Sequence, residues 1–267
     1  MIDNNKNLLI DVSNIALNAG REIMNYYNSN SHVLTKEDKS PLTEADLASN
    51  NIIIEKLRLL NDNIPILSEE SLVEWEERKN WSTYWLIDPL DGTKEFINKN
   101  GEFTVNIALI KNAEPILGVI YSPFLSELYF AQKDQGAYKI NCSDTIKSLE
   151  NSVKILSNNK KNSDEIIIIG SRSHSNNKFN EWINKNYKNY QILQKGSSLK
   201  FCEIASGNAD LYPRFGPTSE WDIAAGHIIL KEAGGSLLTL NNKQIFYNTK
   251  DSLINPEFIA SNNLIKI

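Results

Sequence analysis

The sequence contains little cysteine, and this scarcity limits the kinds of protein that it can encode. Its 267 residues include only Cys142 and Cys202, which are too few for a disulfide framework. Their separation is also unlike the paired spacings of structural zinc sites. We therefore expect a reducing, cytoplasmic environment.

Long apolar runs and a basic leader are also missing. The first residues, MIDNNKNLLIDVSNIAL, carry acidic and amide side chains with no basic region before the apolar stretch, so we expect no signal peptide. No run of 18 apolar residues is present, which argues against a transmembrane helix. At most, we expect peripheral association with the inner face of the cell membrane.

The chain has no excess of positive charge. Its net charge of -5 and pI of about 5.4 argue against a nucleic-acid polymer as partner, because such binders usually present a basic face. The negative net charge is still compatible with a small anionic ligand, because bound metal ions can make the local electrostatic field positive at one site. With 41% hydrophobic residues, the chain can form one large domain or two lobes.

The first half of the chain shows helical and then strand patterns. Apolar residues three and four apart predict helices over residues 6–28 and 44–60, the second capped by Thr43. Short buried strands are expected at 63–67 and 84–87. Between residues 103 and 138, the segments TVNIALI, ILGVIYS, ELYFAQ and GAYKI predict an antiparallel meander.

After residue 160, strands and helices alternate. The expected strands are EIIIIG, YQILQ and ADLYPR, and the expected helices are NKFNEWINK, SLKFCEIASG and SEWDIAAGHIILKEAGG. The whole pattern predicts a mixed α/β (α+β) protein of two lobes, residues 1–150 and 151–267. The boundary is placed in the polar stretch near residues 145–160.

The stretch WLIDPLDGT has the composition of a metal and phosphate site. A buried strand leads into a turn where Asp88, the Leu90 carbonyl and Asp91 offer oxygens, the ligands that Mg²⁺ prefers. Gly92 and Thr93 follow, and a glycine next to the start of a short TKEF helix suits an anion. The alternative is a simple turn rich in Asp, Pro and Gly. The spacing does not match a calcium-binding EF-hand loop.

Three further acids strengthen the metal hypothesis, although each has an ordinary alternative. Glu69 follows a strand-like NIPIL, where a solvated acidic loop is the simpler interpretation. Asp222 stands three residues after Ser219, close to the spacing of a capping box. Asp46 lies in the first turn of a helix, where the macrodipole favours an acid. The alternatives do not explain why all of them occur together.

This combination resembles the inositol monophosphatase superfamily, whose members share the DPLDGT element, an upstream Glu-Glu and a downstream Trp-Asp. Within it, the chain is similar to the 3'(2'),5'-bisphosphate nucleotidases of the bacterial CysQ type. That narrower similarity rests on SRSHSN at 171–176, on residues 196–222 and on SLINPEF near the C-terminus. The resemblance covers nearly the whole chain and implies a two-lobed, layered αβαβα sandwich.

The resemblance also implies roles for individual residues. Two or three Mg²⁺ ions would be held by Glu69, Asp88, the Leu90 carbonyl, Asp91 and Asp222. The catalytic residues would be Asp46, Thr93 and Glu69, with Asp46 and Thr93 acting on the attacking water. The substrate would contact Glu69, Leu90, Asp91, Gly92, Thr93, Ser197, Ser198, Lys200, Arg214 and Asp222.

Several positions keep an ordinary alternative beside these roles. Lys200 could equally be an exposed lysine on a helix, and Arg214 a surface residue at the end of a strand. His227 is interpreted as a core or helix-face histidine. Arg172 and His174 are weaker candidates for nucleotide contacts. Lys39 stands where the related enzymes often carry Asp or Asn, and its role is left open.

The implied activity is Mg²⁺-dependent hydrolysis of the 3'-phosphate of 3'-phosphoadenosine 5'-phosphate, which yields AMP and phosphate and is linked to sulfur metabolism. Inhibition by Li⁺ is implied as well. The sequence does not rank this substrate against its 5'-phosphosulfate relative. An inositol phosphatase, a fructose 1,6-bisphosphatase and a nucleotide-sensing binding module stay as alternatives. Both a monomer and a homodimer are compatible with the sequence.

Overall fold

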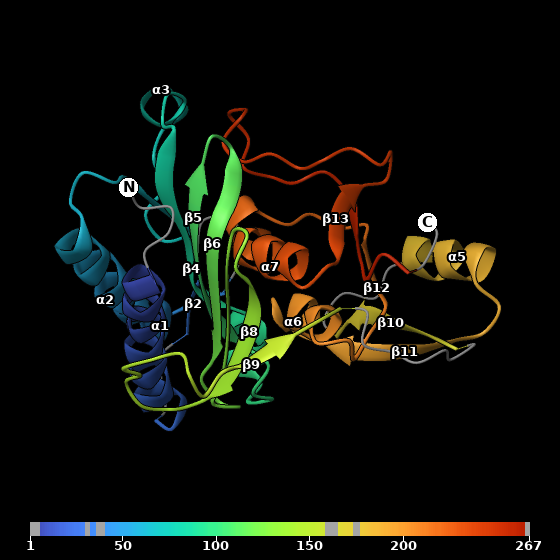
Figure 1. Cartoon of the computed structure of the whole chain (residues 1–267), viewed down its shortest axis with the longest axis horizontal. Coiled ribbons are helices and arrows are strands. Elements are labelled where there is room, and N and C mark those ends of the chain that lie inside the picture. Colours follow the sequence, from blue (N-terminus) through green and yellow to red (C-terminus); the bar gives the residue numbers. More distant parts are fainter. Residues whose placement is uncertain (1–5, 30–32, 36–40, 158–164, 173–176, 265–267) are drawn as a thin grey trace.

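A computed structural model describes residues 6–29, 33–35, 41–157, 165–172 and 177–264. Its helices and sheets lie in five successive layers along the longest axis of the molecule (Figure 1). Among the described residues, no helix is long and apolar enough to cross a membrane.

The first half of the chain forms a seven-stranded sheet. In spatial order its strands are β3 (Ile66–Ser68), β4 (Thr83–Asp91), β5 (Thr104–Lys111), β6 (Glu114–Ser122), β7 (Glu127–Gln132), β8 (Gly136–Asn141) and β9 (Val153–Ile155). Strands β3 and β4 are parallel, and all other neighbours are antiparallel. The meander predicted from β5 to β8 is thus confirmed.

Two long helices cover the outer face of this sheet. Helix α1 (Lys6–Tyr27) and helix α2 (Glu44–Leu60) pack against each other and against the central strands, as Figure 1 shows. The apolar positions of α1, including Val12, Ala16 and Ile23, are fully buried there. Both helices match their sequence predictions, and Thr43 is the N-cap of α2. The short strands β1 (Val33–Thr35) and β2 (Pro41–Thr43) pair beside them, and helix α3 (Trp75–Arg78) precedes β4.

A second helical layer separates the two sheets. Helix α6 (Leu199–Ala205) and helix α7 (Glu220–Glu232) form it, and α7 packs across β4 to β8. The approach is close: a Cβ atom on Gly118 of β6 would lie 2.7 Å from the carbonyl oxygen of Ala225. Buried side chains from both halves of the chain therefore form one continuous cluster between the sheets.

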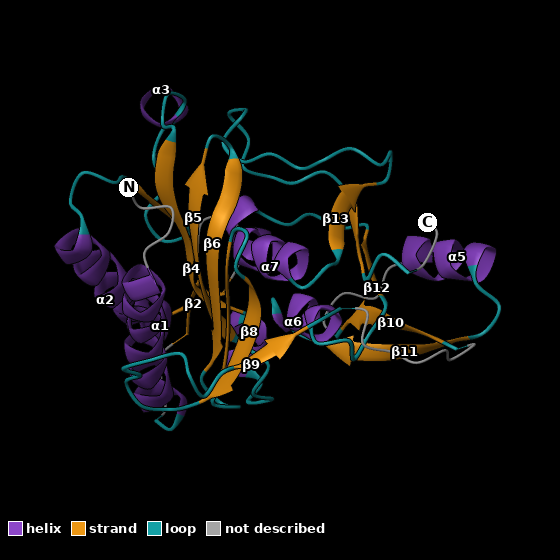
Figure 2. Ribbon diagram, in the orientation of Figure 1, coloured by secondary structure: helices purple, strands orange, loops and turns teal. Residues whose placement is uncertain are grey.

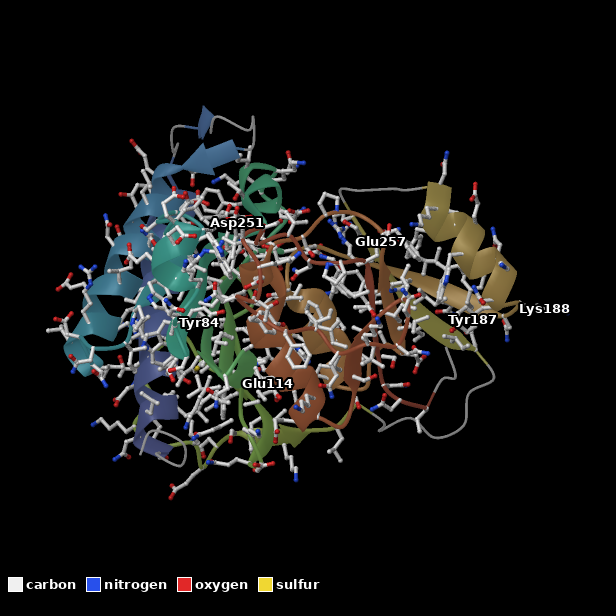
Figure 3. The ribbon with its side chains drawn as sticks, turned by 90° about the horizontal axis from the view of Figure 1, so that it is seen from above. Tyr84, Glu114, Tyr187, Lys188, Asp251 and Glu257 are labelled. Atoms are coloured by element: carbon white, nitrogen blue, oxygen red, sulfur yellow. The ribbon has the colours of Figure 1, made fainter. Side chains whose placement is uncertain are left out.

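The second sheet and one outer helix complete the layers. The sheet has the order β11 (Tyr190–Lys195), β10 (Ile166–Ser171), β12 (Leu211–Arg214), β14 (Phe258–Ser261) and β13 (Ser236–Thr239). Helix α5 (Asn177–Asn186) packs on its far face through Phe179, Trp182 and Ile183. In Figure 2 the sheets and helices alternate, and Figure 3 places Tyr84 of β4 far from Tyr187 and Lys188, which follow α5. The αβαβα layering is confirmed.

The division into lobes 1–150 and 151–267 stays a prediction. Strand β9, at 153–155, still pairs with β8 of the first sheet. Helix α7, from the second segment, packs on that same sheet. The two segments consequently share a core and are in close contact along α7.

Candidate active site

The DPLDGT turn lies where the seven-stranded sheet meets the second half of the chain. Asp88 pairs with Asn106 across β4 and β5, Asp91 pairs with Thr104, and the register shifts between the two aspartates. This irregularity lets both aspartates reach one pocket of about 300 Å³. The predicted residues that line the pocket are Glu69, Asp88, Leu90, Asp91, Gly92, Thr93, Ser197, Lys200, Arg214 and Asp222.

The carboxylates of the pocket destabilise one another's charged forms. Burial, followed by the charges of Glu69, Asp91, Asp222 and Asp46, raises the pKa of Asp88 well above its ordinary value. Burial and then the charge of Asp91 raise the pKa of Asp222 in the same way. The pKa of Asp91 is raised to about 6, mainly by burial. Such a cluster fits divalent cations, which would offset the mutual repulsion.

Hydrogen bonds to backbone N–H groups hold one oxygen of several of these carboxylates. Leu90 N donates to Asp88 Oδ1 (3.1 Å), Ser198 N donates to Asp91 Oδ2 (2.5 Å), and Ser219 N donates to Asp222 Oδ2 (2.8 Å). Hydrogen bonds of this kind are how the groups around a metal site orient its ligands. The capping box that was the ordinary alternative for Asp222 is present, and the same residue also lines the pocket.

The acids share the pocket without forming a compact cage. Within the part of the chain that the structure describes, no three His, Cys, Asp or Glu side chains lie close enough together to hold a metal ion. The convergence expected from the sequence is therefore only partial.

Asp46 does not line the pocket but contacts a residue that does. One of its oxygens, Oδ2, accepts hydrogen bonds from Thr43 N (2.7 Å) and Thr43 Oγ1 (2.6 Å), the capping interaction expected at the start of α2. The other, Oδ1, accepts a hydrogen bond from Thr93 Oγ1 (3.2 Å). Asp46 is thus both a helix cap and a partner of the pocket threonine.

Gly92 has a conformation and a setting that favour glycine. Its φ of 91° lies in the left-handed region, and it caps helix α4 (Thr93–Ile97). A Cβ atom there would lie 3.0 Å from the carbonyl oxygen of Glu102 and 3.3 Å from Ser197 Cβ. The close packing of the turn against the second half of the chain therefore requires a residue without a side chain.

Two cations from the second half of the chain also line the pocket. Lys200 is 7% exposed, its Nζ donates to Ser197 O (2.6 Å), and it stands over the Tyr212 ring. Burial lowers its pKa to about 8. Arg214 donates through Nε to Gly216 O (3.2 Å) and through Nη2 to Pro217 O (3.0 Å). The pocket thus contains acids and cations together, and Lys200 and Asp91 interact through their charges.

Ser198 differs from its expected position. It is 2% exposed and is not among the residues that line the pocket, whereas Ser197 is. The Ser198 hydroxyl contacts Asn106 and Thr104 instead of the cavity. The left-handed backbone of Ser197, with φ of 46°, places the two consecutive serines in different surroundings.

The structure gives the contacts of two of the weaker candidates, Arg172 and His227. Arg172 makes two 2.8 Å hydrogen bonds to the Glu102 carboxylate, so its guanidinium is engaged away from the pocket. Lys39 and His174 lie outside the described residues. The ring of His227 faces Tyr247, with its Nδ1 2.9 Å from the Tyr247 hydroxyl, which agrees with a core histidine.

Sequence reasoning missed several residues of the pocket wall. Glu95, 6% exposed, lines the pocket, as do Tyr212 and Thr218. Tyr212 could have been found, because residues two apart on a strand share a face and Arg214 was already a candidate. Glu95 gave no such signal, since a Glu in a short helix is usually solvated.

The chain matches a known family over nearly its whole length. The model of the inositol monophosphatase family matches residues 4–266. The chain therefore belongs to the inositol monophosphatase family.

Individual relatives are similar over nearly their full length. The 3'(2'),5'-bisphosphate nucleotidase CysQ of Salmonella typhimurium is 43% identical over 253 residues, which are 94% of this chain and 98% of that protein. The enzyme of the same name from Buchnera aphidicola is 44% identical over 260 residues, 96% of this chain and 94% of that protein. The crystal structure of CysQ from Bacteroides thetaiotaomicron superimposes with a TM-score of 0.85 at 39% identity, covering 96% of this chain and 97% of that one.

Proposed function

We propose that this chain is a Mg²⁺-dependent 3'(2'),5'-bisphosphate nucleotidase that removes the 3'-phosphate of 3'-phosphoadenosine 5'-phosphate. The products are AMP and inorganic phosphate. The observation that carries the proposal is a single pocket that Asp88, Asp91 and Asp222 line together with Lys200 and Arg214. The similarity to bacterial nucleotidases over nearly the whole chain supports the choice of substrate.

The donor set fits Mg²⁺. Glu69, Asp88, the Leu90 carbonyl, Asp91 and Asp222 would hold the ions, two or three in number, and all of these donors are oxygens. The raised pKa of Asp88, caused by burial and by neighbouring acids, is the electrostatic feature that cations would relieve. When bound, Mg²⁺ makes water more acidic and neutralises charge on the phosphoryl group.

Asp46 and Thr93 are positioned to handle the attacking water. Because the Thr93 hydroxyl donates to Asp46 Oδ1, its lone pairs are turned toward other donors, such as a water in the pocket. The water then passes its proton toward Asp46 as its oxygen bonds to phosphorus. The bond between phosphorus and the 3'-oxygen breaks, that oxygen takes up a proton from solvent water to become the ribose hydroxyl, and Asp46 returns its proton to solvent. Glu69 is proposed to help orient the same water.

Lys200 and Arg214 are proposed to recognise the part of the substrate that does not react. A nucleotide bisphosphate carries a second phosphate, and a guanidinium suits a two-point contact with it. The carbonyls of Gly216 and Pro217 brace Arg214 at the pocket wall. Ser197 and the Tyr212 ring, both in the pocket, would contact the nucleoside. A simple inositol phosphate would leave these groups unused.

The remaining parts of the proposal concern the cell and the assembly. We place the enzyme in the cytoplasm, where it would clear a by-product of sulfate assimilation or sulfotransfer, and we expect Li⁺ to inhibit it. A small nucleotide is the proposed partner, and both a monomer and a homodimer are compatible with the site lying within one chain.

A substrate panel tests the proposal. Purified protein is assayed with Mg²⁺ for phosphate release from 3'-phosphoadenosine 5'-phosphate, inositol 1-phosphate and fructose 1,6-bisphosphate, and the nucleotide product is identified by chromatography. We expect AMP, with the nucleotide preferred by at least tenfold in kcat/KM, a difference of about 1.4 kcal/mol. Faster hydrolysis of inositol 1-phosphate would reject the substrate. Tight nucleotide binding without turnover would instead favour a sensing module.

A further inference from the structure

Asp91 receives hydrogen bonds from both halves of the chain on a single oxygen. Its Oδ2 accepts from Ser198 N at 2.5 Å and from Asn106 Nδ2 at 3.3 Å. Asn106 belongs to β5 of the first sheet, whereas Ser198 immediately precedes α6 of the second half. The direction of the Asp91 carboxylate therefore depends on how the two halves are docked.

A buried polar chain fixes the two donors. Ser198 Oγ donates to Asn106 Oδ1 at 2.7 Å, which turns the Asn106 amide nitrogen toward Asp91. Ser198 Oγ also lies 2.8 Å from Thr104 Oγ1, and because its own hydrogen is used, the Thr104 hydroxyl must donate. Thr104, Asn106 and Ser198 are at most 2% exposed. Each is thereby paired, as buried polar groups must be.

The buried polar residues of β5 occur at the end near the pocket. Residues two apart share a face, and the face of β5 toward the second half carries Thr104 and Asn106, then Ala108 and Ile110 of the core. Thr104 and Asn106 are the cross-strand partners of Asp91 and Asp88. An apolar residue at position 106 would continue the core pattern, so packing alone does not account for Asn106.

The loop that supplies Ser198 is held at its other end as well. Gly196 N donates to Glu102 Oε2 at 2.7 Å, and Arg172 pairs with both oxygens of that carboxylate. Between these anchors, Ser197 keeps a left-handed backbone at φ of 46°, a conformation that persists only when the surroundings enforce it. One rigid loop thus contacts Asp91 and also carries Ser197 into the pocket.

We propose that Asn106, supported by Ser198 and Thr104, is a positioning residue that aims the Asp91 carboxylate at the bound Mg²⁺. The proposal rests on the proposed function, since it assigns Asp91 to the metal. Groups that orient metal ligands typically contribute about 10- to 100-fold in metal affinity or activity. Asn106 contacts neither substrate nor water in this role and acts only through Asp91.

The test measures Mg²⁺ binding directly and compares two matched variants. Asn106→Ala removes a buried Asn that donates to a partly buried Asp. Asn262→Ala does the same at the far end of β12, where Asn262 Nδ2 donates to Asp210 Oδ1 at 2.8 Å and both residues are buried. Mg²⁺ is titrated by calorimetry and by tryptophan fluorescence, because Trp221 adjoins Asp222. Ser198→Ala, which leaves the Asn106 side chain in place, is measured if Asn106→Ala does not fold.

We expect Asn106→Ala to bind Mg²⁺ at least tenfold more weakly than wild type. We also expect a matching rise in the Mg²⁺ concentration for half-maximal turnover and little change in the nucleotide KM at saturating Mg²⁺. Ser198→Ala should show a smaller loss in the same direction, and Asn262→Ala should lose stability only. Wild-type Mg²⁺ affinity in Asn106→Ala or Ser198→Ala, beside a working wild-type enzyme, overturns the positioning role alone. A wild-type chain that neither binds Mg²⁺ nor turns over nucleotide overturns the proposed function as well.

Discussion

Thr93 Oγ1 donates a hydrogen bond to Asp46 Oδ1 over 3.2 Å, although 47 positions separate the two residues in the chain. Asp46 is held in turn by the backbone and hydroxyl of Thr43 at the start of α2. The structure thus connects a helix cap in the outer layer to the DPLDGT turn in the pocket. This pair is the proposed path for the proton of the attacking water.

Removing the hydroxyl of this pair should slow turnover while leaving substrate binding nearly intact. Thr93→Val keeps the branched shape but cannot hydrogen-bond to Asp46, so we expect kcat to fall by about 100-fold or more with little change in KM. Steady-state kinetics at saturating Mg²⁺ measure this. Thr239→Val, in β13, is the control and should keep wild-type kcat. An unchanged kcat in Thr93→Val would remove the pair from the mechanism.

Neutralising Asp91 should abolish activity without unfolding the chain. Asp91→Asn preserves the shape of the side chain and removes a partly buried charge whose pKa is raised to about 6, mainly by desolvation. We therefore expect normal circular dichroism, equal or higher thermal stability without Mg²⁺, and a loss of turnover to background. Asp210→Asn, a buried carboxylate of the second sheet, should behave in the opposite way, with lower stability and retained activity. Substantial turnover in Asp91→Asn would contradict the metal assignment.

The Lys200 ammonium should matter more for a nucleotide than for a simple phosphate ester. Lys200→Met keeps the aliphatic stem beside Tyr212 and removes the charge. We expect kcat/KM to fall by about tenfold or more for 3'-phosphoadenosine 5'-phosphate, since a contact with a charged group contributes about 1.5–3 kcal/mol, and much less for p-nitrophenyl phosphate. Lys178→Met, at an exposed pair with Glu257, serves as the control. Equal losses on both substrates would count against the nucleotide role.

His227 should make stability depend on mildly acidic pH. Burial lowers the pKa of this ring to about 4 from an ordinary 6.5, so the unfolded chain binds a proton between these values and the folded chain does not. The free energy of unfolding should therefore fall as the pH drops from about 6.5 to 4, by at most about 3 kcal/mol from this residue. Urea unfolding at both ends of that range measures the slope. His227→Gln should show a smaller fall in the free energy of unfolding over this pH range. An identical slope in both proteins would refute the lowered pKa of His227.

Much of the fold could be predicted because local patterns specified it. The steps of three and four in α1 and α2, the meander from β5 to β8 and the alternation after residue 160 all match the structure. The strands that were missed are β1, β2, β9, β13 and β14, each of three or four residues. Segments that short carry almost no periodicity, and pairing with distant strands decides their conformation.

The candidate site was only partly predictable, for a different physical reason. The pocket residues of the DPLDGT turn follow from a continuous motif, whereas Asn106 reads as one polar residue inside an apolar strand. Its partner Ser198 lies 92 positions away, so the sequence gives no sign of the contact. Likewise, nothing in two consecutive serines shows that Ser197 faces the pocket and Ser198 the interior.

Anomalous diffraction from crystals grown with Mn²⁺, a substitute for Mg²⁺ at oxygen sites, addresses the central claim most directly. The claim is that acids from β4, from the turn after β3 and from α7 hold divalent ions in one pocket. We predict anomalous peaks within coordination distance of the carboxylates of Glu69, Asp88, Asp91 and Asp222. A pocket without peaks at a saturating Mn²⁺ concentration, or peaks only at other surfaces, would contradict the account.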